Sequence, residues 1–187
     1  HDYTNLDFLK YMDDFIKQKQ GGFQREDVLE LVKKMPSSNV SNYMFRNKGN
    51  LQFANLSEKW GLSRPSNSSG AAYSDLDKDG DLDLVVNNIN LPAFIYQNES
   101  KQKSDNHYLN IQFKGNAPNT MGIGTTVKIY ASGNSQHQEQ MPTRGFQSNV
   151  SFELHFGLGK SQTIDSLKVT WASGKVQVLK NVKADQA

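Results

Sequence analysis

Five aspartates alternate with other residues along one short stretch of the chain, and only one lysine lies among them. The stretch runs from Asp75 to Val86 and reads DLDKDGDLDLVV, with the acids at Asp75, Asp77, Asp79, Asp81 and Asp83. Carboxylates packed this densely repel one another unless a cation neutralises them. Oxygen ligands at alternate loop positions, followed by Gly80 for a sharp turn, suit Ca²⁺, whereas Mg²⁺ prefers a strict octahedron and keeps its waters. The spacing predicts a calcium site.

The expected ligand set follows from what comes after the glycine. An EF-hand places a bidentate glutamate at the twelfth loop position, but that position here is Val86, which cannot ligate. The run Leu84–Val86 instead predicts a buried strand. We therefore expect the side chains of four aspartates to bind the ion, with the backbone carbonyl of Asp81 between them: Asp75, Asp77, Asp79 and Asp83. The alternative is a solvated acidic turn that binds no metal.

The segment SGAAYSDLDKDGDLDLVVNN resembles the FG-GAP or VCBS repeat, the blade unit of integrin-α-like β-propellers. The resemblance covers roughly Tyr43–Ser100, and it implies a hairpin loop between two blade strands that holds Ca²⁺. An internal repeat supports it, because YMFRN at Tyr43 and FIYQN at Phe94 are 51 residues apart. One blade and part of another cannot close a ring of about four to eight blades. We expect the remaining blades upstream.

Composition limits the other function classes. The net charge is +2 and no basic stripe with interleaved aromatic residues is present, which argues against a nucleic-acid partner. The absence of cysteine excludes a disulfide scaffold, a thiolate zinc site and a cysteine nucleophile. No apolar run approaches the ~20 residues that a membrane-spanning helix requires.

The calcium loop indicates where the protein works. A calcium loop of this kind works best where calcium is abundant, so we expect an extracytoplasmic location: periplasmic, cell-surface or secreted. The chain begins with His1 rather than methionine, which predicts a mature product or an excised fragment.

Two amphipathic helices are predicted before the repeat region, over residues 4–20 and 25–35. Thr4, with Asp7 three residues later, resembles a capping box. We expect the apolar faces of these helices to pack on a sheet, with partner binding as the alternative. The chain then divides into a helical segment (1–36), a blade region with the calcium loop (37–103) and a third domain (104–187).

The third domain is predicted to be a β-sandwich, because long alternating strands are separated by Gly/Asn turns. Its sequences NHYLNIQFKG, GIGTTVKIYASG and HFGLG with VTWASGKVQ resemble the ASPIC/UnbV domain over about residues 106–186. That domain follows FG-GAP repeats in cartilage-acidic-protein-like proteins and in bacterial exported proteins. The resemblance carries no catalytic residue onto this chain.

The predicted fold is therefore mainly β, with a helical pair, partial propeller blades and a β-sandwich. The predicted function is a non-enzymatic, calcium-binding, extracytoplasmic binding or scaffold module whose protein or glycan ligand is unidentified. Exposed strand edges could pair with a second copy to form a homo-oligomer.

Two rival functions remain open. The first is a glycan-active enzyme or accessory domain, for which Glu139, Glu153 and Asp165 supply candidate carboxylates without a defined separation. The second is a cell-surface adhesion module that binds its ligand through the propeller face, with calcium bridging the two.

Overall fold

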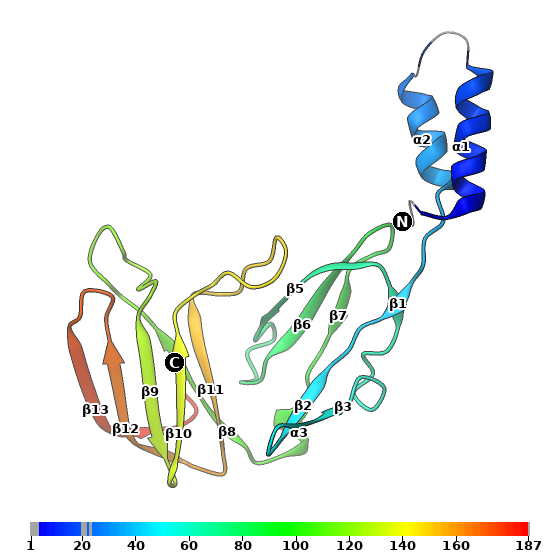
Figure 1. Cartoon of the computed structure of the whole chain (residues 1–187). Helices are drawn as coiled ribbons and strands as arrows, with labels where there is room; N and C mark the ends of the chain where they lie inside the picture. Colours follow the sequence, from blue (N-terminus) through cyan, green and yellow to red (C-terminus); the bar gives the residue numbers. More distant parts are fainter. Residues whose placement is uncertain (1–3, 20–21, 23, 187) are drawn as a thin grey trace. The chain divides into compact units, whose positions relative to one another are not determined.

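The computed structural model describes residues 4–19, 22 and 24–186 (Figure 1). The protein is mainly β, with several small sheets and short helices, as the sequence predicted. None of the described helices is long and apolar enough to cross a membrane.

The chain separates into two compact units. The first contains the residues up to Ser68 together with Asn88–Pro92, and the second contains Ser69–Asn87 and the residues from Ala93 onward. The contacts thus group the acidic loop with the C-terminal region of the chain. The three-part division predicted from sequence stays a prediction.

The first unit holds two helices and two short two-stranded sheets, in which β1 pairs with β4 and β2 pairs with β3. Its elements are α1 (Leu6–Gln18), α2 (Arg25–Lys34), β1 (Val40–Ser41), β2 (Phe45–Gly49), β3 (Gln52–Asn55) and β4 (Pro65–Ser66). The two predicted helices are confirmed, and so is the hairpin around the turn at Gly49.

Two details of the helical prediction are wrong. The N-cap of α1 is Asn5, whose Oδ1 accepts a hydrogen bond from Phe8 N at 2.9 Å, so Thr4 is not the cap. Apart from Phe8, which is 5% exposed, the apolar side chains of both helices also stay largely exposed, for example 77% at Leu6 and 49% at Val28, instead of packing on a sheet. Polar contacts link α1 to α2, because Tyr11 OH donates to Glu30.

The second unit contains the acidic loop, a three-stranded sheet and a two-layer sandwich. Its elements are β5 (Ser68–Ser74), β6 (Asp83–Asn88), β7 (Phe94–Tyr96), α3 (Ser100–Lys103), β8 (His107–Gln112), β9 (Thr126–Ala131), β10 (Asn134–Glu139), β11 (Glu153–Gly159), β12 (Thr163–Thr170) and β13 (Val176–Lys183). The strand order is β5-β6-β7 in the first sheet, β10-β9-β12-β13 in the second and β11-β8 in the third.

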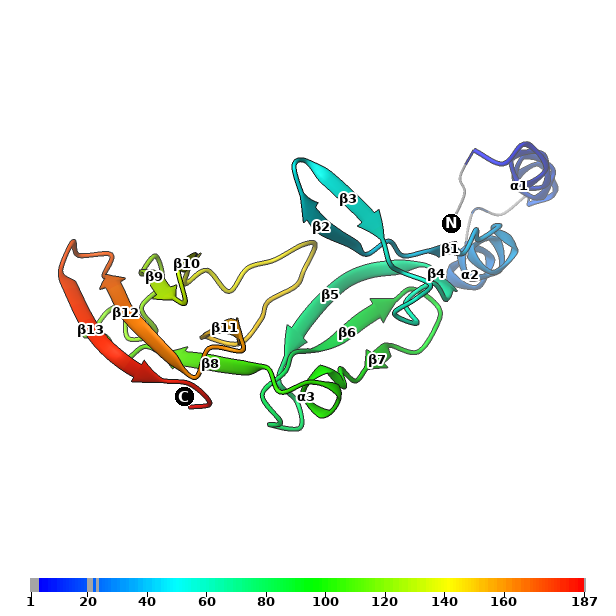
Figure 2. The same ribbon diagram turned by 90° about the horizontal axis from the view of Figure 1, so that it is seen from below.

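The core of this unit lies between the four-stranded sheet and the β8–β11 pair, which are drawn side by side in Figure 2. Phe156 on β11 is fully buried, as are Val127 on β9 and Ile164 on β12. These residues alternate along their strands with more exposed ones, so each strand turns one face to the core. Burying each such side chain stabilises the fold by about 1.5–3 kcal/mol. The predicted sandwich is confirmed.

The two open edges of the sandwich differ. At one edge, Gln136 and Gln138 on β10 donate from Nε2 to backbone carbonyls of β11, at 2.7 and 2.6 Å. At the other edge the two-stranded layer is too narrow to cover β13, and Leu179 remains 54% exposed. Gln186 begins a parallel pairing with Leu109 of β8 at that edge. The polar edge is the one that adjoins the candidate site.

Candidate metal centre

The acidic loop connects β5 to β6 as a hairpin (Figure 1). Two of its residues have positive φ, Lys78 at 61° and Gly80 at 95°. The φ of Gly80 favours glycine, because a residue with a side chain is strained in that conformation. A Cβ atom at Gly80 would also lie only 2.1 Å from Cε1 of Tyr108, so the loop backbone lies directly against that ring.

Three carboxylates of the loop converge. One oxygen from each of Asp75, Asp77 and Asp79 can be chosen so that all three lie within 4.8 Å of one another. The loop backbone holds the first of them, because Asp75 Oδ1 accepts from Asp79 N at 3.1 Å and its Oδ2 from Gly80 N at 3.0 Å. Asp77 is held from outside the loop by Gln97 Nε2, which donates to its Oδ2 at 2.7 Å.

Two carboxylate oxygens of the acidic loop are buried without a hydrogen-bond partner: Asp79 Oδ2 and Asp81 Oδ1. A buried carboxylate oxygen that lacks a partner is costly, and a bound cation would satisfy it. The hydrogen bond from Asp81 N lowers the pKa of Asp79, but burial and the charges of Asp81, Asp77 and Asp75 outweigh it and raise that pKa above its usual range. The chemistry of the donors therefore fits a hard divalent cation such as Ca²⁺.

Asp83 clamps the hairpin with both of its carboxylate oxygens. Oδ2 accepts from Leu76 N at 3.0 Å and Oδ1 accepts from Asn98 N at 2.8 Å, and the residue is only 2% exposed. The first bond ties the two ends of the loop together, and the second ties β6 to the segment after β7. Asp83 therefore has a structural role that does not depend on a metal.

Asp81 fastens the loop to the short helix α3. Its Oδ2 accepts hydrogen bonds from Lys101 N at 2.8 Å and from Ser100 Oγ at 3.1 Å. The side chain is 8% exposed, so these bonds replace water around one of its two oxygens. Its other oxygen is the unpartnered Oδ1.

A pair of stacked rings supports the loop from the sandwich. Tyr108 on β8 and His155 on β11 are nearly parallel, with ring centroids 5.7 Å apart. His155 Nδ1 lies 2.8 Å from Asn110 Oδ1, an acceptor, so Nδ1 carries the proton. Burial lowers the pKa of His155, although the charges of Asp75 and Asp81 act in the opposite direction. The imidazole is therefore neutral near pH 7, and Nε2 is its unprotonated nitrogen.

The structure thus brings together three of the five predicted ligands and gives the carboxylates of Asp81 and Asp83 other contacts. The sequence analysis missed the residues that hold the cluster from outside: Gln97, Asn98, Ser100, Lys101 and Tyr108. The repeated asparagine of the FIYQN motif was the one available signal, since the side chain of Asn98 donates from Nδ2 to Leu82 O at 3.2 Å.

Comparison with known families gives two matches along the chain. The model of the FG-GAP-like repeat matches residues 25–86, and the ASPIC and UnbV model matches residues 115–187. None of the curated proteins compared matches the chain. FG-GAP repeats are typical of extracellular proteins, and domains of both kinds are typically binding modules without catalytic activity. The chain is therefore similar to FG-GAP-like repeat proteins over its first match and to ASPIC and UnbV proteins over its second, which confirms the predicted resemblance.

Proposed function

We propose that this protein is a calcium-binding, non-enzymatic binding or scaffold module that works outside the cytosol. The observation that carries the proposal is the acidic loop, in which three carboxylates converge beside two buried oxygens without partners. The side chains of Asp75, Asp77 and Asp79 would hold the ion. The backbone carbonyl of Asp81 and the carboxylate of Asp83 complete the proposed set, because each carboxylate oxygen keeps a second lone pair after accepting one hydrogen bond.

The ion would act as a structural element. It would offset the repulsion among the loop carboxylates and fix the hairpin against the Tyr108 ring. The loop in turn anchors α3 through Asp81 and the segment after β7 through Asp83. Binding of Ca²⁺ would therefore stabilise the whole second unit rather than the loop alone.

The positions of the candidate carboxylates favour a binding module over a glycan-active enzyme. Glu153 lines the same cavity as Asp75, but both oxygens of Asp75 already accept backbone N–H groups. A carboxylate held in this way is fixed as part of the loop and is poorly placed to exchange a proton with a substrate. The other candidate carboxylates, Glu139 and Asp165, do not line that cavity.

Calcium is expected to raise the melting temperature of the protein. A ligand that binds only the folded state at about ten times its dissociation constant adds about 1.4 kcal/mol of stability. For a chain of this size that corresponds to about 3–6 °C. The measurement is a thermal melt followed by circular dichroism, first in EDTA and then with excess Ca²⁺.

The matched variants are Asp77→Ala, which removes an exposed loop carboxylate, and Asp105→Ala, which removes a fully exposed aspartate outside the loop. The first variant should melt at the same temperature with and without Ca²⁺, and the second should keep the wild-type shift. Equal melting of the wild-type protein in both buffers would contradict the proposal.

A further inference from the structure

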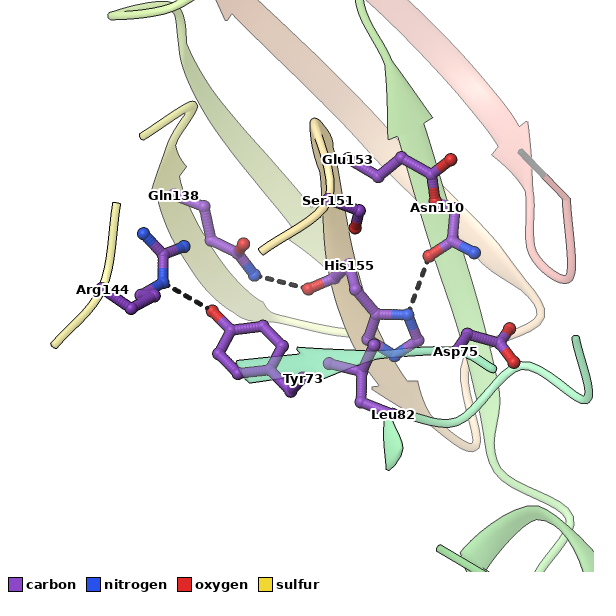
Figure 3. A pocket seen from close by; sticks show the side chains of 9 residues that line it. All are labelled: Tyr73, Asp75, Leu82, Asn110, Gln138, Arg144, Ser151, Glu153 and His155. Carbon is purple, nitrogen blue, oxygen red and sulfur yellow. Dashed lines mark hydrogen bonds between the residues drawn. The ribbon is translucent and has the colours of Figure 1, made fainter. Parts of the chain in front are cut away.

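A second candidate site lies beside the acidic loop, within the same unit. It is a cavity of about 290 Å³, the His155 pocket, shown in Figure 3. Residues from β5, β8, β10 and β11 line it, together with the ends of the acidic loop and the segment between β10 and β11. Its volume is just below the range of about 300–1,000 Å³ that is usual for ligand pockets. It therefore suits a ligand of about one ring.

One wall of the pocket is an arginine held in a fixed position. Arg144 Nε donates to Tyr73 OH at 2.9 Å, and the guanidinium carbon lies 5.7 Å from the centre of that ring. Its Nη1 donates to the backbone carbonyls of Met141 and Thr143. These contacts use Nε and Nη1 and leave Nη2 as a donor. Because the side chain is already ordered, a ligand would bind it at a lower entropic cost.

Hydrogen-bond acceptors and donors both remain available on the other walls. Gln138 uses its Nε2 to reach His155 O, so its Oε1 has no partner among the described residues. Asn110 accepts from His155 through Oδ1, which leaves its Nδ2 as a donor. Glu153 accepts from Gln112 through Oε1 and keeps Oε2. The neutral imidazole of His155 adds the acceptor Nε2.

The chemistry of the lining selects among ligand classes. An anion would need donors alone, and it would meet two carboxylates, Asp75 and Glu153, against the single cation Arg144. A hydroxyl group both donates and accepts, so a ring that carries several hydroxyls matches a mixed set of partners. Leu82 and the partly exposed ring of Tyr73 offer an apolar surface to its C–H groups.

We propose that the His155 pocket binds one neutral monosaccharide unit of a glycan. This inference rests on the proposed function in the sense that it names the ligand class of the binding module. It does not depend on calcium for its polar contacts, since the five polar groups described above lie on β8, β10, β11 and the segment between β10 and β11, outside the acidic loop. The acidic loop forms one rim of the pocket through Asp75.

The test is a titration with methyl glycosides of glucose, galactose, mannose, xylose and N-acetylglucosamine, followed by ¹H–¹⁵N correlation spectra of the full chain. We expect at least one sugar to cause saturable shifts at the amides of Asn110, Gln138 and His155. Glucuronate should bind more weakly than glucose, because its carboxylate meets Asp75 and Glu153. If every sugar leaves these amides unchanged, the proposal is wrong.

Two variants test the position of the site. Tyr73→Ala and the isosteric Glu153→Gln should each weaken the sugar by about tenfold, the loss expected for one good hydrogen bond or contact. Their controls are Tyr130→Ala, which removes a similarly exposed ring that packs against Lys128, and Glu139→Gln at the end of β10. Both controls should bind as the wild type does. Equal losses in variants and controls would overturn the assignment.

The titration is repeated in EDTA and in Ca²⁺ so that the two proposals fail separately. Sugar binding in a protein that does not respond to Ca²⁺ would support the pocket and contradict the metal site. A calcium-dependent melting temperature without sugar binding would leave the metal site intact and overturn the pocket.

Discussion

Replacing Gly80 with alanine is expected to lower the free energy of unfolding by about 2–5 kcal/mol. The new Cβ atom would lie 2.1 Å from Cε1 of Tyr108, a ring that is itself stacked on His155 and cannot withdraw without disturbing that pair. Forcing an extra methyl group into packed surroundings costs about 1–3 kcal/mol. The positive φ of Gly80 adds about 1–2 kcal/mol for any L residue. Urea denaturation of the variant measures the sum.

The matched control for this variant is Gly133→Ala. Gly133 also has a positive φ, 77°, but a Cβ atom there would meet nothing within 4 Å. The control therefore carries only the backbone strain, and the difference between the two variants isolates the contact with Tyr108. Equal destabilisation by both substitutions would show that the loop does not lie against the ring.

Replacing Asp83 with alanine is expected to destabilise the protein by about 2–6 kcal/mol, even in EDTA. The substitution leaves Leu76 N and Asn98 N without an acceptor in a site where Asp83 is 2% exposed. Each buried donor without a partner costs about 1–3 kcal/mol. Denaturation in EDTA is the measurement, because it removes any contribution from a bound ion.

The matched control for this variant is Asp77→Ala, measured in the same buffer. Asp77 is exposed, so its removal in EDTA should change the stability by no more than about 0.5 kcal/mol. The difference between the two variants would show that Asp83, unlike the exposed loop acid, stabilises the fold without a metal. A variant at Asp83 that is as stable in EDTA as the variant at Asp77 would contradict that role.

The acidic loop could be predicted from the sequence because its information is local. The alternation of acids around Gly80 is a property of nine consecutive positions, and the apolar run after it indicated a strand that the structure confirms as β6. The groups that hold the loop in place come from far along the chain, such as Asn98 N and the Tyr108 ring. No periodicity within the loop points to them.

Two other elements show why local patterns fail elsewhere. Strand β10 carries no apolar alternation that could predict it, because its sequence, NSQHQE, has no apolar residue. Its glutamines bond to backbone carbonyls of β11 instead of entering the core. The apolar stripes of α1 and α2 correctly predicted helices, but a stripe does not identify what covers it. The pocket could not be predicted from a local pattern either, because its residues come from separate strands and loops.

Direct calorimetric titration of Ca²⁺ into the EDTA-treated and dialysed protein tests the central claim, that the acidic loop is a metal site. We expect a single binding event, with a dissociation constant of about 10⁻⁴–10⁻³ M if the site resembles other extracellular calcium modules. The event should be lost in Asp79→Ala and retained in Asp105→Ala. The absence of binding heat in the wild-type protein at several temperatures, or an unchanged titration of Asp79→Ala, would contradict the account.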